Sequence, residues 1–172
     1  MKIGAISVVM FVLFLIEGTV AQVFAPEAWG LSWIIVPRFV LVGVIFVGLY
    51  VGRRQALYFG LFFGLLYDVV YTEVIGVNAF AIATLGYLSG LSSRYFHQNW
   101  LLVLVNVLLV VFINEWLVYQ LYHLFNRAFM DTGGLFGKEI IPTVFMNAVF
   151  AMLIFRPMSR LVKKSKVNQE IA

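Results

Sequence analysis

The sequence contains no cysteine and few charged residues. Without cysteine the chain can form no disulfide, offers no thiolate to a metal and has no cysteine nucleophile. Charged residues make up only 12% of the 172 residues, and 63% are hydrophobic, whereas a soluble domain has about 25% charged residues. A single domain of this length cannot hide so much apolar surface from water. The composition therefore excludes an ordinary soluble protein and indicates an integral membrane protein.

Signatures of catalysis and of nucleic-acid binding are also missing from the sequence. The chain has no HExxH, GxSxG, Walker or CxxC motif. His97 and His123 are expected on opposite faces of the membrane, too far apart to share a metal. No basic stretch has the interleaved aromatic residues typical of proteins that bind nucleic-acid strands. We therefore expect no catalytic, cofactor-binding or metal-binding residue and no nucleic-acid partner.

Six apolar segments are long enough to cross a bilayer as helices. Only helices and closed barrels satisfy their backbone in lipid, and these segments lack the period of two that barrel strands show. The sequence therefore predicts one all-α polytopic membrane domain over residues 1–172, a bundle of six transmembrane helices. The expected spans are Ile3–Phe24, Ile34–Tyr50, Gln55–Val70, Val77–Ser93, Trp100–Tyr122 and Ile140–Val162.

The distribution of lysine and arginine predicts the orientation of the bundle. Six spans place both termini on one side, and every basic residue except Arg38, Arg127 and Lys138 falls there. Because basic residues mark the cytoplasmic side, we predict cytoplasmic N- and C-termini, with residues 163–172 as a short basic tail. Glu17 interrupts the first apolar run, so this run is expected to remain as a span rather than to be cleaved as a signal peptide.

Basic residues near the C-terminus are candidates for contact with anionic membrane lipids. They follow Pro157, which is expected to end or kink the sixth span near Arg156. A juxtamembrane basic run attracts anionic lipid, although the same charges are also explained by orientation alone. The candidates are Arg160, Lys163, Lys164 and Lys166.

Four ionisable residues lie inside the predicted spans. On a rise of about 1.5 Å per residue, they come to one level in the outer third of the bilayer. A charge left facing lipid near the membrane centre would cost up to about 3 kcal/mol. The matching depth predicts an intramembrane polar cluster, in which the arginine pairs with one or more carboxylates. These residues are Glu17, Arg38, Asp68 and Glu115.

The composition of this predicted cluster requires further polar partners. Three acids and one base cannot all ionise cheaply, so at least one acid is expected to be protonated or held by amide or hydroxyl donors such as Asn78 and Asn114. The sequence does not assign the pairs. The alternative interpretation is that Arg38 and Asp68 lie close to the outer headgroups, where they are solvated or snorkel.

Glycines recur at four-residue intervals in two predicted spans. Gly60 and Gly64 share a helix face with Asp68, and Gly86 and Gly90 repeat the spacing in the fourth span. Small residues at this spacing let a neighbouring helix approach closely. We therefore expect the helix face that bears Asp68 to be buried against protein.

The fifth span carries polar residues on several sides. Asn106, Asn114 and Glu115 do not fall on one narrow stripe. A helix with this pattern should be surrounded by protein, so the fifth span is the predicted centre of the bundle. Asn147 in the sixth span is expected to join it through an amide hydrogen bond.

Several short motifs follow one another along the first half of the chain. They are Val36-Pro37-Arg38-Phe39, Gly60-x-x-x-Gly64-x-x-x-Asp68, Tyr71-Thr72 and Gly76-Val77. Their order and spacing resemble those of MreD, the rod shape-determining family of bacterial membrane proteins. The resemblance extends to chain length, span count, an early Glu17, a Glu115 in the fifth span and a short basic tail.

This resemblance implies a non-enzymatic scaffold of the cell-wall elongation machinery in the bacterial inner membrane. The implied partners are a bitopic MreC-like protein, MreB filaments, the RodA glycosyltransferase and its class B transpeptidase. The resemblance also implies a fold similar to the S-components, the substrate-binding membrane subunits of energy-coupling-factor importers. A small-molecule-binding importer subunit is therefore the alternative function, although no cofactor and no small-molecule ligand are expected.

Overall fold

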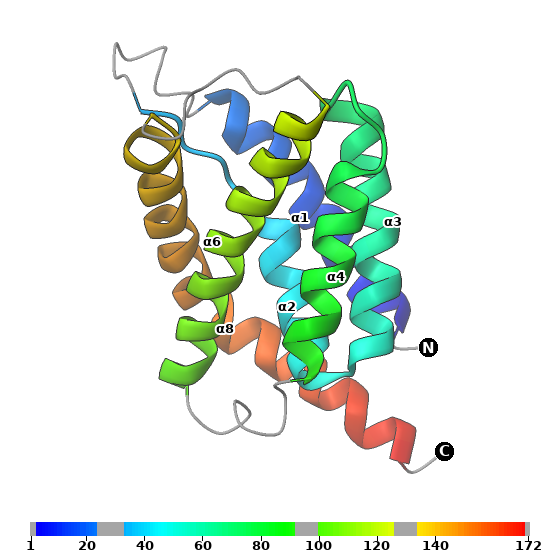
Figure 1. The fold of residues 1–172 in the computed structure, drawn as a ribbon. Coiled ribbons are helices and arrows are strands. Elements are labelled where there is room, and N and C mark those ends of the chain that lie inside the picture. Colours follow the sequence, from blue (N-terminus) through cyan, green and yellow to red (C-terminus); the bar gives the residue numbers. More distant parts are fainter. Residues whose placement is uncertain (1–2, 24–32, 92–99, 126–133, 171–172) are drawn as a thin grey trace.

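The computed structural model describes residues 3–23, 33–91, 100–125 and 134–170, the last stretch with side chains as far as Pro157. All regular elements in these ranges are helices, which confirms the predicted all-α class, and Figure 1 shows them packed as one bundle. The elements are α1 (Ile3–Val23), α2 (Phe39–Tyr50), α3 (Arg53–Tyr71), α4 (Val77–Leu91), α6 (Trp100–Leu124), the π-helix η2 (Leu135–Ile140) and α8 (Ile141–Glu170).

Within the described residues, three helical stretches are long and apolar enough to cross a membrane. They are Gly4–Val23, Trp100–Leu124 and Phe136–Pro157, and α2 and α4 are apolar but shorter. Large apolar side chains such as Val8 and Leu153 are 64% and 72% exposed on the outside of this bundle. Such a surface is costly in water and favourable against lipid, so the fold is that of a membrane protein.

The short helix α2 forms the centre of the bundle. All 12 of its residues are buried, and it contacts α1, α3, α4, α6 and α8. A helix that is hydrophobic all round belongs in a protein interior. The prediction of α6 as the central helix is wrong, because α6 exposes Leu102, Val105 and Leu109 on its outer side. Its one buried face holds the three polar residues singled out in the sequence.

The second predicted span begins as an extended segment rather than as a helix. Residues 33–38 are non-helical, and α2 starts at Phe39 instead of Ile34. Pro37 accounts for the difference, because the residue before a proline avoids the α conformation. The 12-residue helix is about 18 Å long, and the extended residues add about 20 Å. Together they are long enough for a hydrocarbon core of about 30 Å.

Two glycines of α3 set its close approach to α4. A Cβ added at Gly60 would lie 2.6 Å from the Cα of Ala83, and one added at Gly64 would lie 2.5 Å from the Cα of Ala79. Real Cβ atoms do not come this close to a neighbouring backbone. The face of α3 that bears Asp68 therefore packs directly against the backbone of α4.

The glycines of α4 meet two different helices. A Cβ at Gly90 would lie 2.6 Å from the Cα of Arg53 in α3, and one at Gly86 would collide with the side chain of Val44 in α2. The four glycines singled out in the sequence therefore lie at helix contacts inside this chain. Their contacts hold α2, α3 and α4 together as one tightly packed group.

Helix α8 passes through Pro157 and changes direction in its C-terminal half. Pro157 lies inside the helix, and Figure 1 shows the segment from orange to red running under the bundle at an angle to the gold segment. A proline inside a helix removes one backbone hydrogen bond and kinks the axis. The side chains of Arg160, Lys163, Lys164 and Lys166 lie outside the described ones, so their contact with lipid stays a prediction.

We predict that Gly64→Ala lowers the stability of the bundle by about 1–3 kcal/mol, because the added methyl group forces α3 and α4 apart. The matched control is Gly4→Ala in α1, where an added Cβ meets nothing within 4 Å, and where alanine is the better helix former. Thermal unfolding in detergent measures both effects. Equal behaviour of the two variants would contradict the close packing of α3 on α4.

Candidate functional site

Arg38 forms a two-pronged ion pair with Glu115 of α6. Its Nε donates to Oε1 at 2.7 Å, and its Nη2 donates to Oε2 at 3.0 Å. Both residues are buried, and the guanidinium carbon lies 5.4 Å from the centre of the Tyr67 ring. Paired hydrogen bonds in parallel are the strongest form of this interaction, and the ring face adds an attraction for the cation. The arginine is therefore held by α6 and α3 together.

Glu17 of α1 lies at the start of α2, beside the same ion pair. Its Oε2 accepts the backbone N–H of Val40 at 2.8 Å, and the carboxylate also interacts electrostatically with Arg38 and Glu115. The first N–H groups of a helix have no partner within the helix and carry partial positive charge. Arg38, the residue at the N-cap position, makes no side-chain capping bond itself. Glu17 therefore caps α2 from a neighbouring helix.

The extended segment before α2 is bonded to η2 and α8 through alternate backbone N–H groups. Two residues of extended chain advance about 6.6 Å, and four residues of helix advance about 6 Å. These two distances nearly agree. Acceptors spaced about one turn apart along η2 and α8 can therefore bind every second N–H group of the segment. The bonds run from Ile34 to the Lys138 carbonyl at 2.7 Å, from Val36 to Thr143 Oγ1 at 3.0 Å and from Arg38 to Asn147 Oδ1 at 2.8 Å.

Pro142 explains why one of these acceptors is a backbone carbonyl. In an α-helix the carbonyl of Lys138 would accept from residue 142, but proline has no N–H. The chain forms a π-helix here, in which the N–H of Ile141 bonds to the carbonyl of Phe136. The carbonyl of Lys138 is therefore available to Ile34.

Asn147 bonds to the extended segment and not, among its described partners, to α6. Its Nδ2 donates to the carbonyl of Val36 at 3.0 Å and to that of Thr143 at 2.9 Å, while its Oδ1 accepts from Arg38. The sequence had suggested a bond to the fifth span instead. The difference arises because the unwound backbone before α2 offers N–H and carbonyl groups that a continuous helix would not.

Asp68 serves a different helix end. The side chain is fully buried, and its oxygens accept three backbone N–H groups from Gly76 at 2.8 Å, Asn78 at 3.0 Å and Ala79 at 3.0 Å. The Asn78 side-chain Nδ2 donates as well, at 2.9 Å. Thr72, which follows α3, also donates its Oγ1 to this carboxylate, at 3.4 Å. The other described residues bonded to it lie in the turn before α4 and in the first residues of α4. Asp68 of α3 therefore caps α4.

The structure divides the residues of the predicted polar cluster between two places. Glu17, Arg38 and Glu115 meet at the start of α2, and Asn114 Nδ2 lies 3.4 Å from Glu115 Oε1. Asp68 and Asn78 form the second group, at the start of α4. Arg38 is 6% exposed and Asp68 0%, so neither side chain is solvated at the bundle surface.

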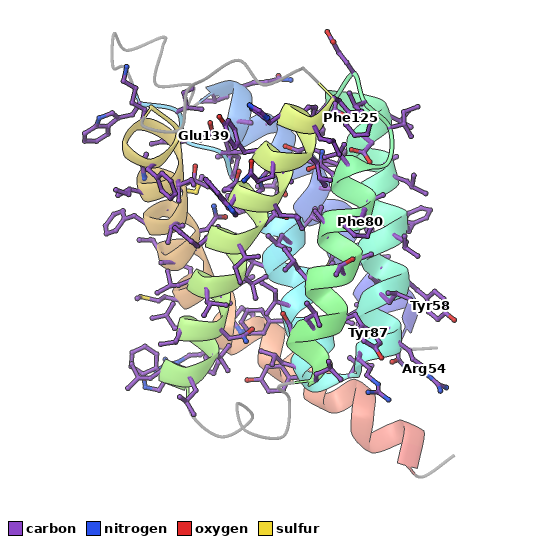
Figure 2. The ribbon with its side chains drawn as sticks, in the orientation of Figure 1. Arg54, Tyr58, Phe80, Tyr87, Phe125 and Glu139 are labelled. Atoms are coloured by element: carbon purple, nitrogen blue, oxygen red, sulfur yellow. The ribbon has the colours of Figure 1, made fainter. Side chains whose placement is uncertain are left out.

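Sequence reasoning missed Thr143 and Glu139 as members of the first group. Glu139 is partly buried and interacts electrostatically with Glu115 and Arg38, and Figure 2 shows it at the end of the bundle where η2 begins. Thr143 could have been found from its position four residues before Asn147, on the same helix face. The signal for Glu139 is weaker, because it lay just outside the predicted sixth span.

The chemistry of both groups is internal to the protein. The carboxylates of Glu17 and Asp68 are bonded to helix N-termini, and Glu115 is bonded to a guanidinium. Among the described residues, no three His, Asp or Glu side chains gather as they would around a metal ion. The arrangement ties helices together through their buried ends.

Comparison with known proteins identifies the family. Residues 2–165 match the family model described as rod shape-determining protein MreD. The chain belongs to the MreD family. A curated relative, the rod shape-determining protein MreD of Bacillus subtilis (strain 168), is 30% identical over 124 residues, which cover 72% of each chain. No solved structure is significantly similar to the chain.

Membership of the MreD family confirms the resemblance drawn from the sequence motifs. With the long apolar helices, it indicates a bacterial membrane protein with a role in determining rod shape. The family match covers both groups of buried polar residues described above. Both groups therefore belong to the part of the chain that is shared with the MreD family model.

We predict that Arg38→Met and Glu115→Leu each lower the free energy of unfolding by about 3–5 kcal/mol, because each leaves the partner's charge buried and unpaired. The double variant should recover part of this loss, since neither charge remains. Unfolding in detergent measures all three proteins, with Arg54→Met at an exposed arginine as the control. If the double variant loses as much unfolding free energy as the two single variants together, the pairing is refuted.

A separate prediction concerns the cap on α4. Asp68→Asn should destabilise the bundle by about 2–3 kcal/mol, because an amide NH2 group would face the N–H donors of the turn and the charge-assisted bonds would be lost. Hydrogen exchange of the Asn78 and Ala79 amides should rise at the same time. Glu73→Gln, at an exposed carboxylate in the same turn, is the control. Unchanged exchange at both amides would rule out the capping role.

Proposed function

We propose that this chain is a non-enzymatic membrane scaffold of the machinery that elongates the bacterial cell wall. It binds a bitopic MreC-like protein beside MreB filaments, RodA and its class B transpeptidase, and so helps to maintain rod shape. The observation that carries the proposal is membership of the rod shape-determining MreD family. The partners and the scaffold role are the parts that go beyond this observation.

The internal bonding of the buried polar groups supports a scaffold over an importer subunit. A small-molecule site needs a concave pocket with polar groups that converge on the ligand. Here the groups best suited to bind an anion are bonded to the protein's own carboxylates: the guanidinium of Arg38 to Glu115, the start of α2 to Glu17 and the start of α4 to Asp68. These carboxylates occupy the positions that a ligand's acidic groups would take.

We also propose that the chain crosses the inner membrane six times with both termini in the cytoplasm. The length of the extended segment plus α2 supports a crossing there, and α3 and α4 are joined by a short turn. Both chain ends lie at the same end of the bundle as Arg54 (Figures 1 and 2). Basic residues at that end favour its placement on the cytoplasmic side.

The test combines cell shape with the composition of the purified complex. Depletion of the chain in its rod-shaped host should round the cells, because sidewall growth loses its scaffold. Purification from native membranes, followed by mass spectrometry of proteins and small molecules together, should recover a single-span partner with a periplasmic coiled coil. Unchanged shape and wall growth would refute the scaffold. A stoichiometric vitamin or metal in the purified protein would favour the importer instead.

A further inference from the structure

Asn106 of α6 is a buried amide that lies outside both groups of polar residues described above. It is 8% exposed, and its Oδ1 is covered by protein but accepts no hydrogen bond from the described part of the chain. Asn78 and Asn114 leave the same atom unpaired, but each donates through Nδ2 to a carboxylate. On the helical rise, Asn106 lies roughly 9 Å inside the membrane-spanning stretch that begins at Trp100. An amide oxygen without a donor at this depth costs free energy and calls for a partner.

Asn106 lies on the border between the buried side and the lipid-facing side of α6. Residues three and four positions away share a side of a helix with it. Val103 and Val110 are buried. Leu102 and Leu109 are exposed. The amide therefore comes within reach of a molecule that packs on the outside of α6, because side chains at an interface commonly change rotamer on binding.

The seam between α4 and α6 is closed at one end of the bundle and open at the other. Val77, Ala81 and Leu88 share one face of α4. Val77 and Ala81 are buried in a cluster with Val118 of α6, whereas Leu88 is 47% exposed. Figure 1 shows the same divergence, because α4 and α6 lie close together at the upper end of the bundle and separate towards the lower end, where α6 begins.

Asn106 lies at the open end of this seam. Leu88 follows Val77 along α4 by about 17 Å of helix, and Asn106 precedes Val118 along α6 by about 18 Å. The two helices run in opposite directions (Figure 1), so Leu88 and Asn106 lie at about the same level. The unpaired amide and the exposed part of α4 therefore belong to one surface.

We propose that a second copy of this chain packs on the open end of the seam between α4 and α6, with Asn106 of one copy bonded to Asn106 of the other. Two copies inserted in the same orientation are related by a two-fold axis along the membrane normal, so the same residue lies at the same depth in both. A carboxamide offers a donor and an acceptor, and two of them facing each other satisfy both. Lipid tails offer neither group, so a lipid in this place would leave the amide unpaired.

The amide pair supplies the specificity of this contact, and apolar side chains supply the rest of its area. Leu88, Leu102 and Leu109 are exposed around Asn106. Lipid tails are as apolar as leucine, so exchanging lipid for a second copy gains packing but little hydrophobic driving force. A polar residue at a helix contact fixes which faces meet, and Asn106 has this position here.

Cross-linking of the full chain in liposomes tests the contact, because the chain has no cysteine of its own. A short dimaleimide should link Leu102→Cys or Leu109→Cys into dimers, since both residues flank Asn106. Phe145→Cys, which is 71% exposed on α8, is the matched control and should remain monomeric. No dimers from the α6 variants, or equal yields from α6 and α8, would overturn the proposal. The liposomes contain this chain alone, so the result does not depend on the scaffold function proposed above.

Energy transfer between donor-labelled and acceptor-labelled copies, with the dyes on Arg54→Cys at an exposed site, tests the amide itself. Asn106→Leu should weaken association about fivefold, which corresponds to ~1 kcal/mol for an amide bond between membrane helices. Asn106→Gln should retain more of the association, because it keeps the amide. The midpoint of unfolding in detergent, where copies are separated, should not fall in Asn106→Leu.

Two results would show that Asn106 serves another purpose. If Asn106→Leu unfolds earlier but associates like the wild type, the amide serves the single copy and the proposal fails. If Asn106→Leu leaves association unchanged but loses a single-span protein from complexes purified from native membranes, the seam belongs to that partner and the proposal also fails.

Discussion

A backbone N–H group inside a membrane must find an acceptor, and the centre of this bundle depends on that requirement. The chain unwinds before Phe39, which leaves the first N–H groups of α2 and those of the extended segment without the bonds of a continuous helix. Other parts of the chain supply the missing acceptors: the carboxylate of Glu17, the amide of Asn147, the hydroxyl of Thr143 and the carbonyl of Lys138. The buried polar side chains are therefore best understood as partners of the backbone.

This requirement also explains how four helices meet at the start of α2. Glu17 links α1 to α2, the Arg38–Glu115 pair links α2 to α6, and Asn147 links α2 to α8. Asp68 does the same for α3 and α4 at a second helix start. Each bond gives a buried polar group a partner within the protein in place of water. Inside the membrane a polar group without such a partner would cost free energy. Polar contacts thus specify which helices are neighbours, and apolar packing fills the space between them.

Much of the fold follows from the sequence alone, because apolar length and helical rise fix where spans begin, end and match in depth. The level shared by Glu17, Arg38 and Glu115 came from this arithmetic. The same arithmetic does not give the direction in which a side chain points around its helix axis. The depth alone therefore grouped Asp68 with the other acids, whereas in the structure it faces α4. The late start of α2 was signalled by Pro37, and the acceptor at Lys138 by Pro142. Both prolines act by interrupting the backbone hydrogen bonds of a helix, and a hydropathy profile contains no information about those bonds.

The bond between Arg38 and Asn147 has a consequence for the biogenesis of the protein. The two residues are 109 positions apart, which a ribosome adding about 5–20 residues per second needs roughly 5 to 20 seconds to translate. During most of this interval α2 has already been synthesised, but the helix that completes its bonding has not been made. The nascent chain must therefore wait beside the insertion machinery, or keep the unwound stretch in contact with water, until its final helix arrives.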